Sequence, residues 1–326
     1  MATVGIIANP ASGKDIRRLV AHGSVFDNQE KVNIVRRVLL GLEAAGVERV
    51  LFMPDYFGIG PRALGGLKLS LEVSFLDMPL RADHRDSTLA ARLMAEAGVG
   101  CIVTLGGDGT NRAVAKGCGE VPLVPISTGT NNVFPYMVEG TIAGLAAGVV
   151  AAGVVEPGRV IQATKRLEIF KDGRLVDIAL VDAVVYDDVF VASRAIWDMS
   201  KVREVILARA RPSNIGLSSL GGCLCPGQLD ESCGMHLKLG EGAVRVLAPI
   251  APGLIERVSI ESYRLLRVGE EVEVTCKPSV LALDGEREVE VRRGERVCVR
   301  LSPKGPRVVD IRQALEEAAK SGMFVS

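Results

Sequence analysis

Three polar loops, each placed directly after a short apolar run, constrain this chain more than any other feature of its sequence. The apolar runs are β-strand candidates, and helical spacing follows the loops. Such repetition is typical of a parallel sheet with helices on both faces, so we predict an α/β fold for residues 1–150. In open sheets the loops that follow the strands meet at one edge, where ligands bind. The runs and their loops are Thr3–Ala8 with Asn9–Lys14, Gly100–Leu105 with Gly106–Asn111, and Leu123–Ile126 with Ser127–Asn132.

Helices are expected between these strands. The spacing predicts one over Ser87–Ala97, capped by Asp86 or Ser87, and another that begins at Asn111. The uncharged, Gly/Ala-rich stretch Gly140–Val155 is shorter than the ~20 apolar residues of a membrane-spanning helix. We therefore predict a buried helix and a turn there.

The second half of the chain has a different pattern of residues. β-prone runs alternate with Gly-containing turns, which predicts a β-rich, sandwich-like substrate domain over residues 151–309. One predicted hairpin pairs Met235–Leu239 with Val244–Leu247 across a Gly-Glu-Gly turn. An amphipathic segment follows, and we predict that residues 310–326 form a C-terminal helix that packs back on the first domain.

Composition restricts the classes of function. The chain has 326 residues, enough for two domains, and its 39 Lys+Arg balance 39 Asp+Glu. A chain without net charge has no excess field to attract nucleic acid or an anionic membrane, so neither is expected as a partner. Seven cysteines without a CxxC spacing argue against a disulfide framework or a structural zinc site. No leader is visible at the amino end, so we expect a cytoplasmic protein without stable membrane insertion.

The sharpest motif is Gly106-Gly107-Asp108-Gly109-Thr110, between a predicted strand and a helix. Glycines let the backbone approach a bulky ligand, and the N–H groups at a helix start favour an anion such as phosphate. Asp108 would repel phosphates unless Mg²⁺ intervenes or it acts as a base toward an acceptor hydroxyl. The plainer alternative is that Asp108 caps the helix.

The other two loops offer neutral donors and acceptors. Asn9 and Ser12 lie in the first loop, which is not a Walker A loop because Lys14 is followed by Asp15. Hydroxyls and amides of the third loop suit a ribose, an adenine edge or phosphate oxygens. The candidate nucleotide-binding residues of that loop are Thr128, Gly129, Thr130 and Asn131.

These motifs together resemble a known superfamily. Asn9-Pro-Ala-Ser-Gly13, Gly106–Thr110, Thr128–Asn131 and Asp284-Gly-Glu286 occur in the order seen in ATP-NAD kinases and diacylglycerol/sphingosine-type lipid kinases. The chain looks most like the ATP-NAD kinase relatives that include the acetoin catabolism X proteins. The Asn-Pro-x-Ser-Gly start and the Asp-Gly-Glu triplet resemble lipid kinases, whereas the Gly/Ser-rich segment Pro212–Gly222 weakly resembles the dinucleotide segment of NAD kinases.

The resemblance implies an ATP-dependent kinase with an NAD kinase-like fold, using ATP and Mg²⁺ and acting on a hydroxyl acceptor, with NAD in first place. It implies that Asp108 takes the acceptor proton, with Glu286 as the rival base, and that Asp284 shapes the turn or holds metal. By the same resemblance Gly106, Gly107, Gly109 and Thr110 would cradle phosphates, and a homo-oligomer is expected.

Several alternatives stay open at this stage. The acceptor could be a lipid or a small hydroxyketone, or the protein could be a non-catalytic sensor that binds NAD or ATP. Gly58-Ile-Gly60-Pro-Arg-Ala63, with Asp77 nineteen residues after Gly58, has the spacing of a Rossmann dinucleotide loop. Pro54–Phe57 separates these glycines from the preceding strand, which favours a plain surface loop there.

Overall fold

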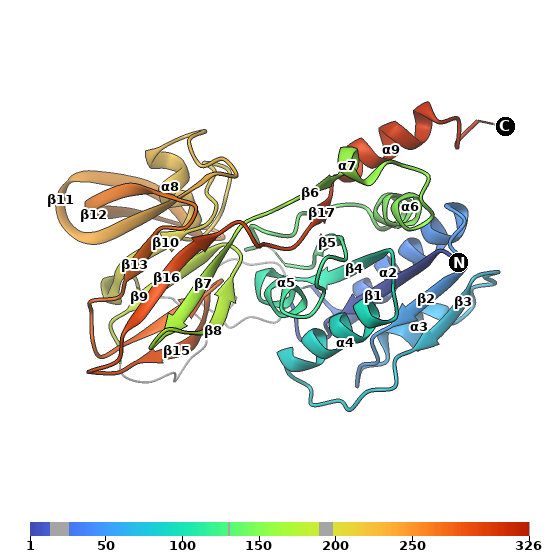
Figure 1. Ribbon diagram of the computed structural model, residues 1–326, viewed down its shortest axis with the longest axis horizontal. Coiled ribbons are helices and arrows are strands. Elements are labelled where there is room, and N and C mark those ends of the chain that lie inside the picture. The colour runs from blue at the N-terminus through green and yellow to red at the C-terminus, as the bar shows by residue number, and fades with distance from the viewer. Residues whose placement is uncertain (14–25, 130, 189–197, 326) are drawn as a thin grey trace.

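The structure, a computed structural model, describes residues 1–13, 26–129, 131–188 and 198–325, apart from the side chains of residues 287 and 288. It has two lobes, one of parallel strands with helices and one of antiparallel strands (Figure 1). The predicted order, an α/β layer followed by a β-rich region, is confirmed.

The first lobe is built on a sheet of seven strands. Five neighbours run parallel, β17 continues the parallel order beside β5, and β6 closes the edge antiparallel to β17. In spatial order the strands are β3 (Glu72–Phe75), β2 (Arg49–Phe52), β1 (Thr3–Ala8), β4 (Cys101–Gly106), β5 (Leu123–Ser127), β17 (Val308–Val309) and β6 (Ile161–Gln162).

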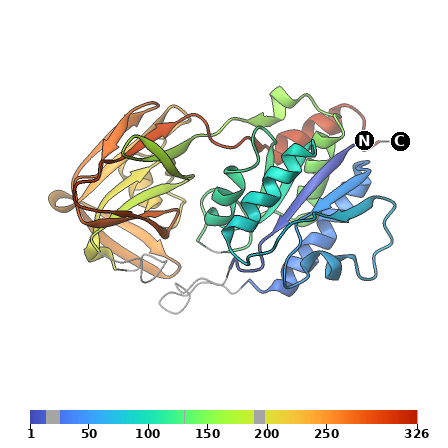
Figure 2. The same ribbon diagram turned by 60° about the horizontal axis from the view of Figure 1, so that its bottom comes forward.

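Helices cover both faces of this sheet, as Figure 2 shows from a second direction. The apolar core of one face is shared by α2 (Asn28–Ala44), α3 (Ile59–Leu64), α6 (Gly140–Ala151) and α9 (Ile311–Lys320). The other face is covered by α4 (His84–Glu96) and α5 (Asp108–Ala115). The short helix α7 (Pro157–Val160) leads into β6.

The glycines of α6 explain its composition. A Cβ on Gly144 would lie 2.3 Å from the carbonyl oxygen of Val38 in α2, and one on Gly140 would lie 2.8 Å from that of Ile34. The two helix backbones therefore approach closely only because these positions lack side chains. The predicted buried helix is confirmed, ending at Ala151.

Two predicted helix starts were wrong. Helix α4 begins at His84 with Asp83 as its cap, because the carboxylate of Asp86 instead accepts hydrogen bonds from the N–H groups of Arg81 and Ala82. Helix α5 begins at Asp108 rather than Asn111, with Gly107 as its N-cap residue. The glycine motif thus forms the first turn of the helix itself.

The second lobe is a sandwich of two antiparallel sheets. Apolar side chains from both sheets, among them Ile169, Val185, Ile206, Leu281 and Val299, form its core. The six-stranded sheet has the order β12 (Leu254–Arg267), β11 (Cys233–Ala251), β10 (Val202–Leu207), β9 (Asp182–Tyr186), β14 (Ser279–Leu283), β15 (Glu286–Val291). The four-stranded sheet has the order β13 (Glu271–Glu273), β16 (Val297–Ser302), β7 (Arg166–Lys171), β8 (Arg174–Ala179). A 3₁₀ turn (Met199–Lys201) precedes β10, and α8 (Ser218–Leu224) packs on the outer face of the larger sheet.

The hairpin predicted across Gly-Glu-Gly was wrong. Residues 233–251 form one long strand, β11, which pairs with β12 on both sides of an irregularity, and the glycines lie in that irregularity, between Leu239 and Val244. A Cβ on Gly242 would lie 2.1 Å from the carbonyl oxygen of Ile260, so the strands cross closely there. The chain reverses instead at Pro252-Gly253, where Gly253 has φ +76°.

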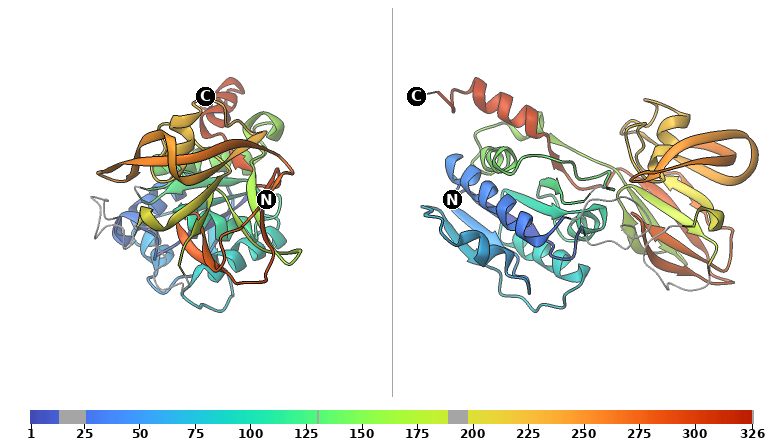
Figure 3. Two further views of the ribbon diagram at one scale, coloured as in Figure 1. Left: turned by 90° about the vertical axis from the view of Figure 1, so that its left-hand side faces the viewer. Right: turned by 180° about the vertical axis from the view of Figure 1, so that it is seen from behind.

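The chain passes between the lobes more than once. Strands β6 and β17, both from residues 151–309, hydrogen-bond in the first sheet. Helix α9 follows and places Ile311, Ala314 and Ala318 in the core. The helix lies beside α6, as the rear view in Figure 3 shows. The division into residues 1–150, 151–309 and 310–326 stays a prediction.

None of the helices in the described ranges is both long and apolar enough to cross a membrane.

Candidate functional site

The three polar loops meet at the carboxyl edge of the parallel sheet. Asn9 Nδ2 donates a hydrogen bond of 2.9 Å to Thr110 Oγ1, which joins the loop after β1 to the glycine loop. The hydroxyls of Ser12 and Thr128 lie 2.9 Å apart, which joins the first loop to the loop after β5. The sheet therefore gathers residues about a hundred positions apart, as the loop pattern predicted.

A buried lysine shapes the first loop, and sequence reasoning missed it. Lys31 of α2 has no exposed surface, and its Nζ donates to the carbonyl oxygens of Asn9 at 2.9 Å and Ser12 at 2.7 Å. The signal was present in the sequence, because Lys31 stands at the start of the apolar stripe that Val35 and Val38 continue. A cation in that stripe indicates a buried set of acceptors.

Internal packing accounts for two of the glycines in the motif. A Cβ on Gly106 would lie 2.4 Å from Cβ of Thr110, and one on Gly107 would lie 2.7 Å from Oδ1 of Asn132. Asn132 itself donates to Ser127 Oγ at 2.9 Å. The glycine loop and the loop after β5 thus pack directly against each other.

The carboxylate of Asp108 is hydrogen-bonded to the backbone of the neighbouring loop. Its carboxylate accepts hydrogen bonds from the N–H groups of Val133 at 3.1 Å and Phe134 at 2.7 Å, and the residue is 8% exposed. Those bonds tie the start of α5 to the segment that follows Thr128–Asn132. In this geometry the carboxylate holds two loops together, which sets it apart from an exposed base.

The turn between β14 and β15 brings the other predicted carboxylates to the same place. Asp284, at φ +52°, accepts hydrogen bonds from the N–H groups of Leu180, Val181 and Asp182 at 2.8–3.3 Å. Burial raises its pKa, while Arg112 and these N–H groups act in the opposite direction. This carboxylate fixes the turn, and its predicted role as a metal ligand stays a prediction.

Glu286 lies two residues further on and faces the glycine loop. A Cβ on Gly109 would be 3.3 Å from Oε1 of Glu286, so the first turn of α5 and this carboxylate are in contact distance. The side chain of Glu286 is 38% exposed, against 0% for that of Asp284. Of the predicted carboxylates, Glu286 is the one that solvent and a small molecule can reach.

Arg112 connects the two lobes at this point, and sequence reasoning gave it no role. Its side chain is 4% exposed and lies 3.7 Å from Asp177, 3.8 Å from Asp284 and 3.9 Å from Glu286. The neighbouring Lys116 lies in ion-pair contact with Asp177 at 2.5 Å. A buried cation from α5 thus faces acidic groups from β8 and from the β14–β15 turn.

The loop after β5 holds two more of the predicted nucleotide contacts, Asn131 and Thr130. Asn131 has a buried Oδ1, and a Cβ on Gly216 of the Gly/Ser-rich segment would lie 3.7 Å from it. Thr130 lies outside the described residues. Within the described ranges no group of three or more His, Cys, Asp and Glu side chains is arranged to hold a metal ion.

The Rossmann-like string after β2 is explained by packing. A Cβ on Gly60 in α3 would lie 2.6 Å from the ring of Phe75 and 2.9 Å from that of Phe52. This glycine lets α3 lie against the aromatic side chains of the sheet.

Comparisons with known proteins agree with the two-lobe division. Residues 4–154 match the ATP-NAD kinase N-terminal domain, and residues 165–304 match the acetoin catabolism protein X C-terminal domain. Acetoin catabolism protein X of Cupriavidus necator is 42% identical over 337 residues, covering 99% of this chain and 94% of that protein.

Two structures of a putative diacylglycerol kinase from Bacillus anthracis are each 14% identical, with a TM-score of 0.46. Both cover 94% of this chain, and this chain covers 97% and 98% of theirs.

Proposed function

Because this chain belongs to the family of acetoin catabolism protein X, with an N-terminal domain of the ATP-NAD kinase type, we propose that it is an ATP-dependent kinase acting on a hydroxyl group. The resemblance read from the sequence motifs is confirmed at the level of the family. The identity of the acceptor, with NAD in first place, is the part that we propose.

The observation that carries the proposal is the convergence of the three loops with Glu286. The bonds from Asn9 to Thr110 and between Ser12 and Thr128 hold the loops at the edge where α5 begins. The N–H groups at a helix start favour anions such as the phosphates of ATP. An accessible carboxylate stands beside that start, as phosphoryl transfer to a hydroxyl requires.

We assign the proton-accepting step to Glu286. A general base must be reachable by the acceptor hydroxyl. The oxygens of Asp108 already accept hydrogen bonds from Val133 and Phe134, whereas Glu286 is partly exposed beside Gly109. Asp108 then keeps the glycine loop in place while Glu286 takes the proton.

Within the described residues, no group of three or more His, Cys, Asp and Glu side chains is arranged to hold Mg²⁺. The carboxylate of Asp284 accepts hydrogen bonds from backbone N–H groups. Mg²⁺ commonly binds through substrate phosphates with one or two carboxylates. We therefore expect the ion to arrive with ATP as part of the substrate. Thr128, Gly129, Thr130 and Asn131 remain the proposed contacts to the nucleotide.

The position of the Gly/Ser-rich segment Pro212–Gly222, next to the loop after β5, supports NAD as the acceptor. Gly216 lies next to the buried Oδ1 of Asn131, so this segment reaches the nucleotide loop and can present backbone groups to a second, dinucleotide substrate. A small hydroxyketone is the second candidate, because the name of the 42% identical relative refers to acetoin, which has one hydroxyl.

The deciding experiment offers the purified protein Mg-ATP with NAD, with acetoin or with diacylglycerol in vesicles, and follows the products by phosphorus NMR. Formation of NADP supports the NAD assignment. Phosphorylated acetoin or lipid with no NADP would overturn it. Tight ATP binding with no phosphorylated product from any acceptor would contradict the kinase proposal and leave a nucleotide sensor.

A further inference from the structure

The inner face of the six-stranded sheet changes from apolar to polar at one end. In the middle it contributes Ile206 and Leu266 to the sandwich core. Beyond them the opposite sheet ends in β13, which has three residues, and polar side chains take over. Glu204, His236 and Lys238 stand there on the strands that carry the core.

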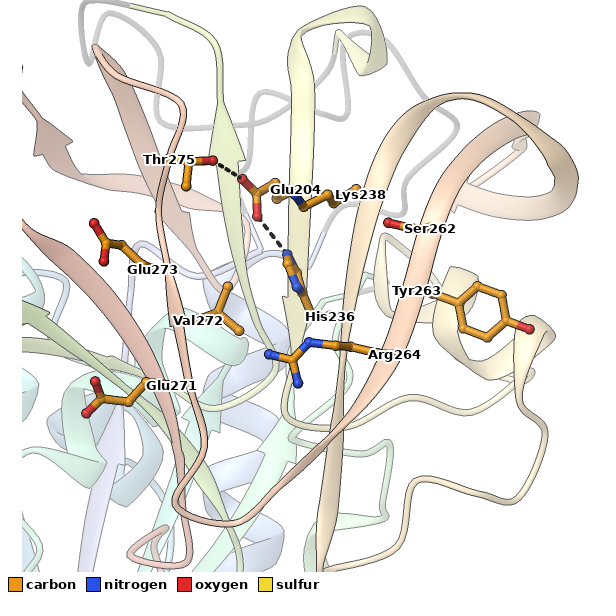
Figure 4. Close-up of a pocket in the computed structure, with 10 residues that line it drawn as sticks. All are labelled: Glu204, His236, Lys238, Ser262, Tyr263, Arg264, Glu271, Val272, Glu273 and Thr275. Carbon is orange, nitrogen blue, oxygen red and sulfur yellow. Dashed lines mark hydrogen bonds and ion pairs between the residues drawn. The ribbon is translucent and has the colours of Figure 1, made fainter.

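These side chains surround a hollow of about 380 Å³, within the size range of pockets for small ligands (Figure 4). Strands β10, β11 and β12 form one wall, and β13 with Thr275 forms the other. The hollow lies on strands of the sandwich and includes none of the residues of the loop edge described above.

A buried pair of polar side chains lines this hollow. His236 Nε2 and Glu204 Oε2 are 2.7 Å apart, and their side chains are 10% and 7% exposed. Thr275 Oγ1 donates to the other oxygen of Glu204 at 3.4 Å. Burying polar side chains at inner positions of a sandwich costs free energy that an apolar pair of similar volume would not cost. Packing alone therefore does not explain these two residues.

Lys238 gives the hollow its charge. It stands directly opposite Glu204 in the strand register, so both side chains lie on the same face. The carboxylate of Glu204 is turned to His236, and Lys238 makes no ion pair with any residue in the described part of the chain. An ammonium group beside a buried histidine and threonine is a ready partner for an oxyanion.

The remaining charged groups around the hollow have partners. Arg264 pairs with Glu270 at 3.0 Å on the surface. On the opposite wall, Glu271 lies 3.9 Å from Arg300, and Glu273 lies within 3.7 Å of Lys277 and Arg296. Each acidic side chain of that wall thus has a cation within 4 Å, whereas Lys238 has no ion pair among the described residues.

We propose that this hollow is a second binding site, for a small polar molecule that carries a carboxylate or phosphate group. Lys238 holds the oxyanion, and His236, oriented by Glu204, contacts its polar remainder. The site is separate from the proposed kinase site, so either can fail without the other.

The histidine itself provides the test, because the chain has three histidines and their ring signals can be separated by NMR. The probes are inorganic phosphate and acetate, added at constant ionic strength to the full chain, and a His236→Gln variant identifies the signal of His236. We expect that signal to shift in a saturable manner with at least one probe. The probe that binds more tightly distinguishes a phosphate ligand from a carboxylate ligand.

Lys238→Met should raise the dissociation constant about tenfold or more, as loss of a charged hydrogen bond does, and Lys238→Arg should retain binding. The matched control is Lys68→Met, an exposed lysine on the other lobe, which should change nothing. No saturable shift with either probe, or equal affinity in Lys238→Met, would overturn the proposal.

Discussion

Oε2 of Glu286 lies 3.9 Å from Nη2 of Arg112, so an acid from the sandwich meets a cation from the helix that carries the glycine motif. The contact joins two lobes whose strands are otherwise organised in separate sheets. It places a partly exposed carboxylate beside the start of α5.

Glu286→Gln should lower the turnover of the proposed kinase by about 10²–10⁴, the usual contribution of a positioned base, with little change in stability. Asp108→Asn should instead lower the free energy of unfolding by about 1–3 kcal/mol, because two N–H groups lose a charged acceptor. Steady-state kinetics and urea unfolding measure the two effects. The control is Glu290→Gln, on the same strand and 43% exposed. Wild-type stability of Asp108→Asn combined with lost turnover would return the base role to Asp108.

Arg112→Met should destabilise the protein by about 3–5 kcal/mol, because it leaves the buried carboxylate of Asp284 without its cation. The matched control is Arg307→Ala. That arginine pairs with Glu120, both are more than half exposed, and the loss should stay below about 1 kcal/mol. Urea unfolding of both variants gives the comparison. Equal losses would mean that the buried cluster contributes no more than a surface pair.

Gly107→Ala should disturb the packing of two loops, since the added methyl would meet Oδ1 of Asn132 at 2.7 Å. We expect a loss of about 1–3 kcal/mol and weaker ATP binding. Combining it with Asn132→Ala should be clearly less harmful than the sum of the single changes, by about 0.5–3 kcal/mol. Gly158→Ala, where a Cβ meets nothing within 4 Å, is the control. Strict additivity in the unfolding measurements would show that the steric contact is not the cause.

Glu168 should make stability depend on pH on the acid side. Burial tends to raise its pKa, but Arg300 at 2.7 Å and Arg166 at 2.6 Å outweigh this and hold the pKa below its usual value. A lowered pKa stabilises the fold above the unfolded value, and this contribution is lost as the pH falls through the folded value.

Glu168→Gln should therefore be less stable than wild type by about 3 kcal/mol at pH 7, with a gap that narrows below pH 4.5. Urea unfolding at a series of pH values measures the gap. Glu120→Gln, on an 81% exposed side chain, should follow wild type throughout. A gap that stays constant with pH would indicate lost packing rather than lost charge.

Features that depend on neighbouring residues in the chain could be predicted from the sequence. Loops such as Asn9–Ser12 and Gly106–Thr110 are marked by glycine and polar residues directly after apolar strands, so their convergence at one sheet edge could be predicted. Strand β11 shows the opposite case. Its Gly-Glu-Gly resembles a hairpin turn, and only the close approach to Ile260 explains glycine there.

The missed residues act over long separations. Lys31 serves carbonyl groups about twenty positions away, and Arg112 faces carboxylates up to 174 positions away. Strands of two residues, β6 and β17, are too short to carry a periodic pattern. Their pairing is decided by tertiary neighbours, which no local window contains.

The return of the chain through β17 and α9 sets an order of assembly. Strand β17 joins the parallel sheet beside β5 only at Val308. Ala314 and Ala318 of α9 then complete the core on one face of that sheet. During synthesis the sandwich strands therefore leave the ribosome before the parallel sheet of the first lobe is complete. Part of the apolar face of the amino-terminal layer therefore stays uncovered until α9 has been made.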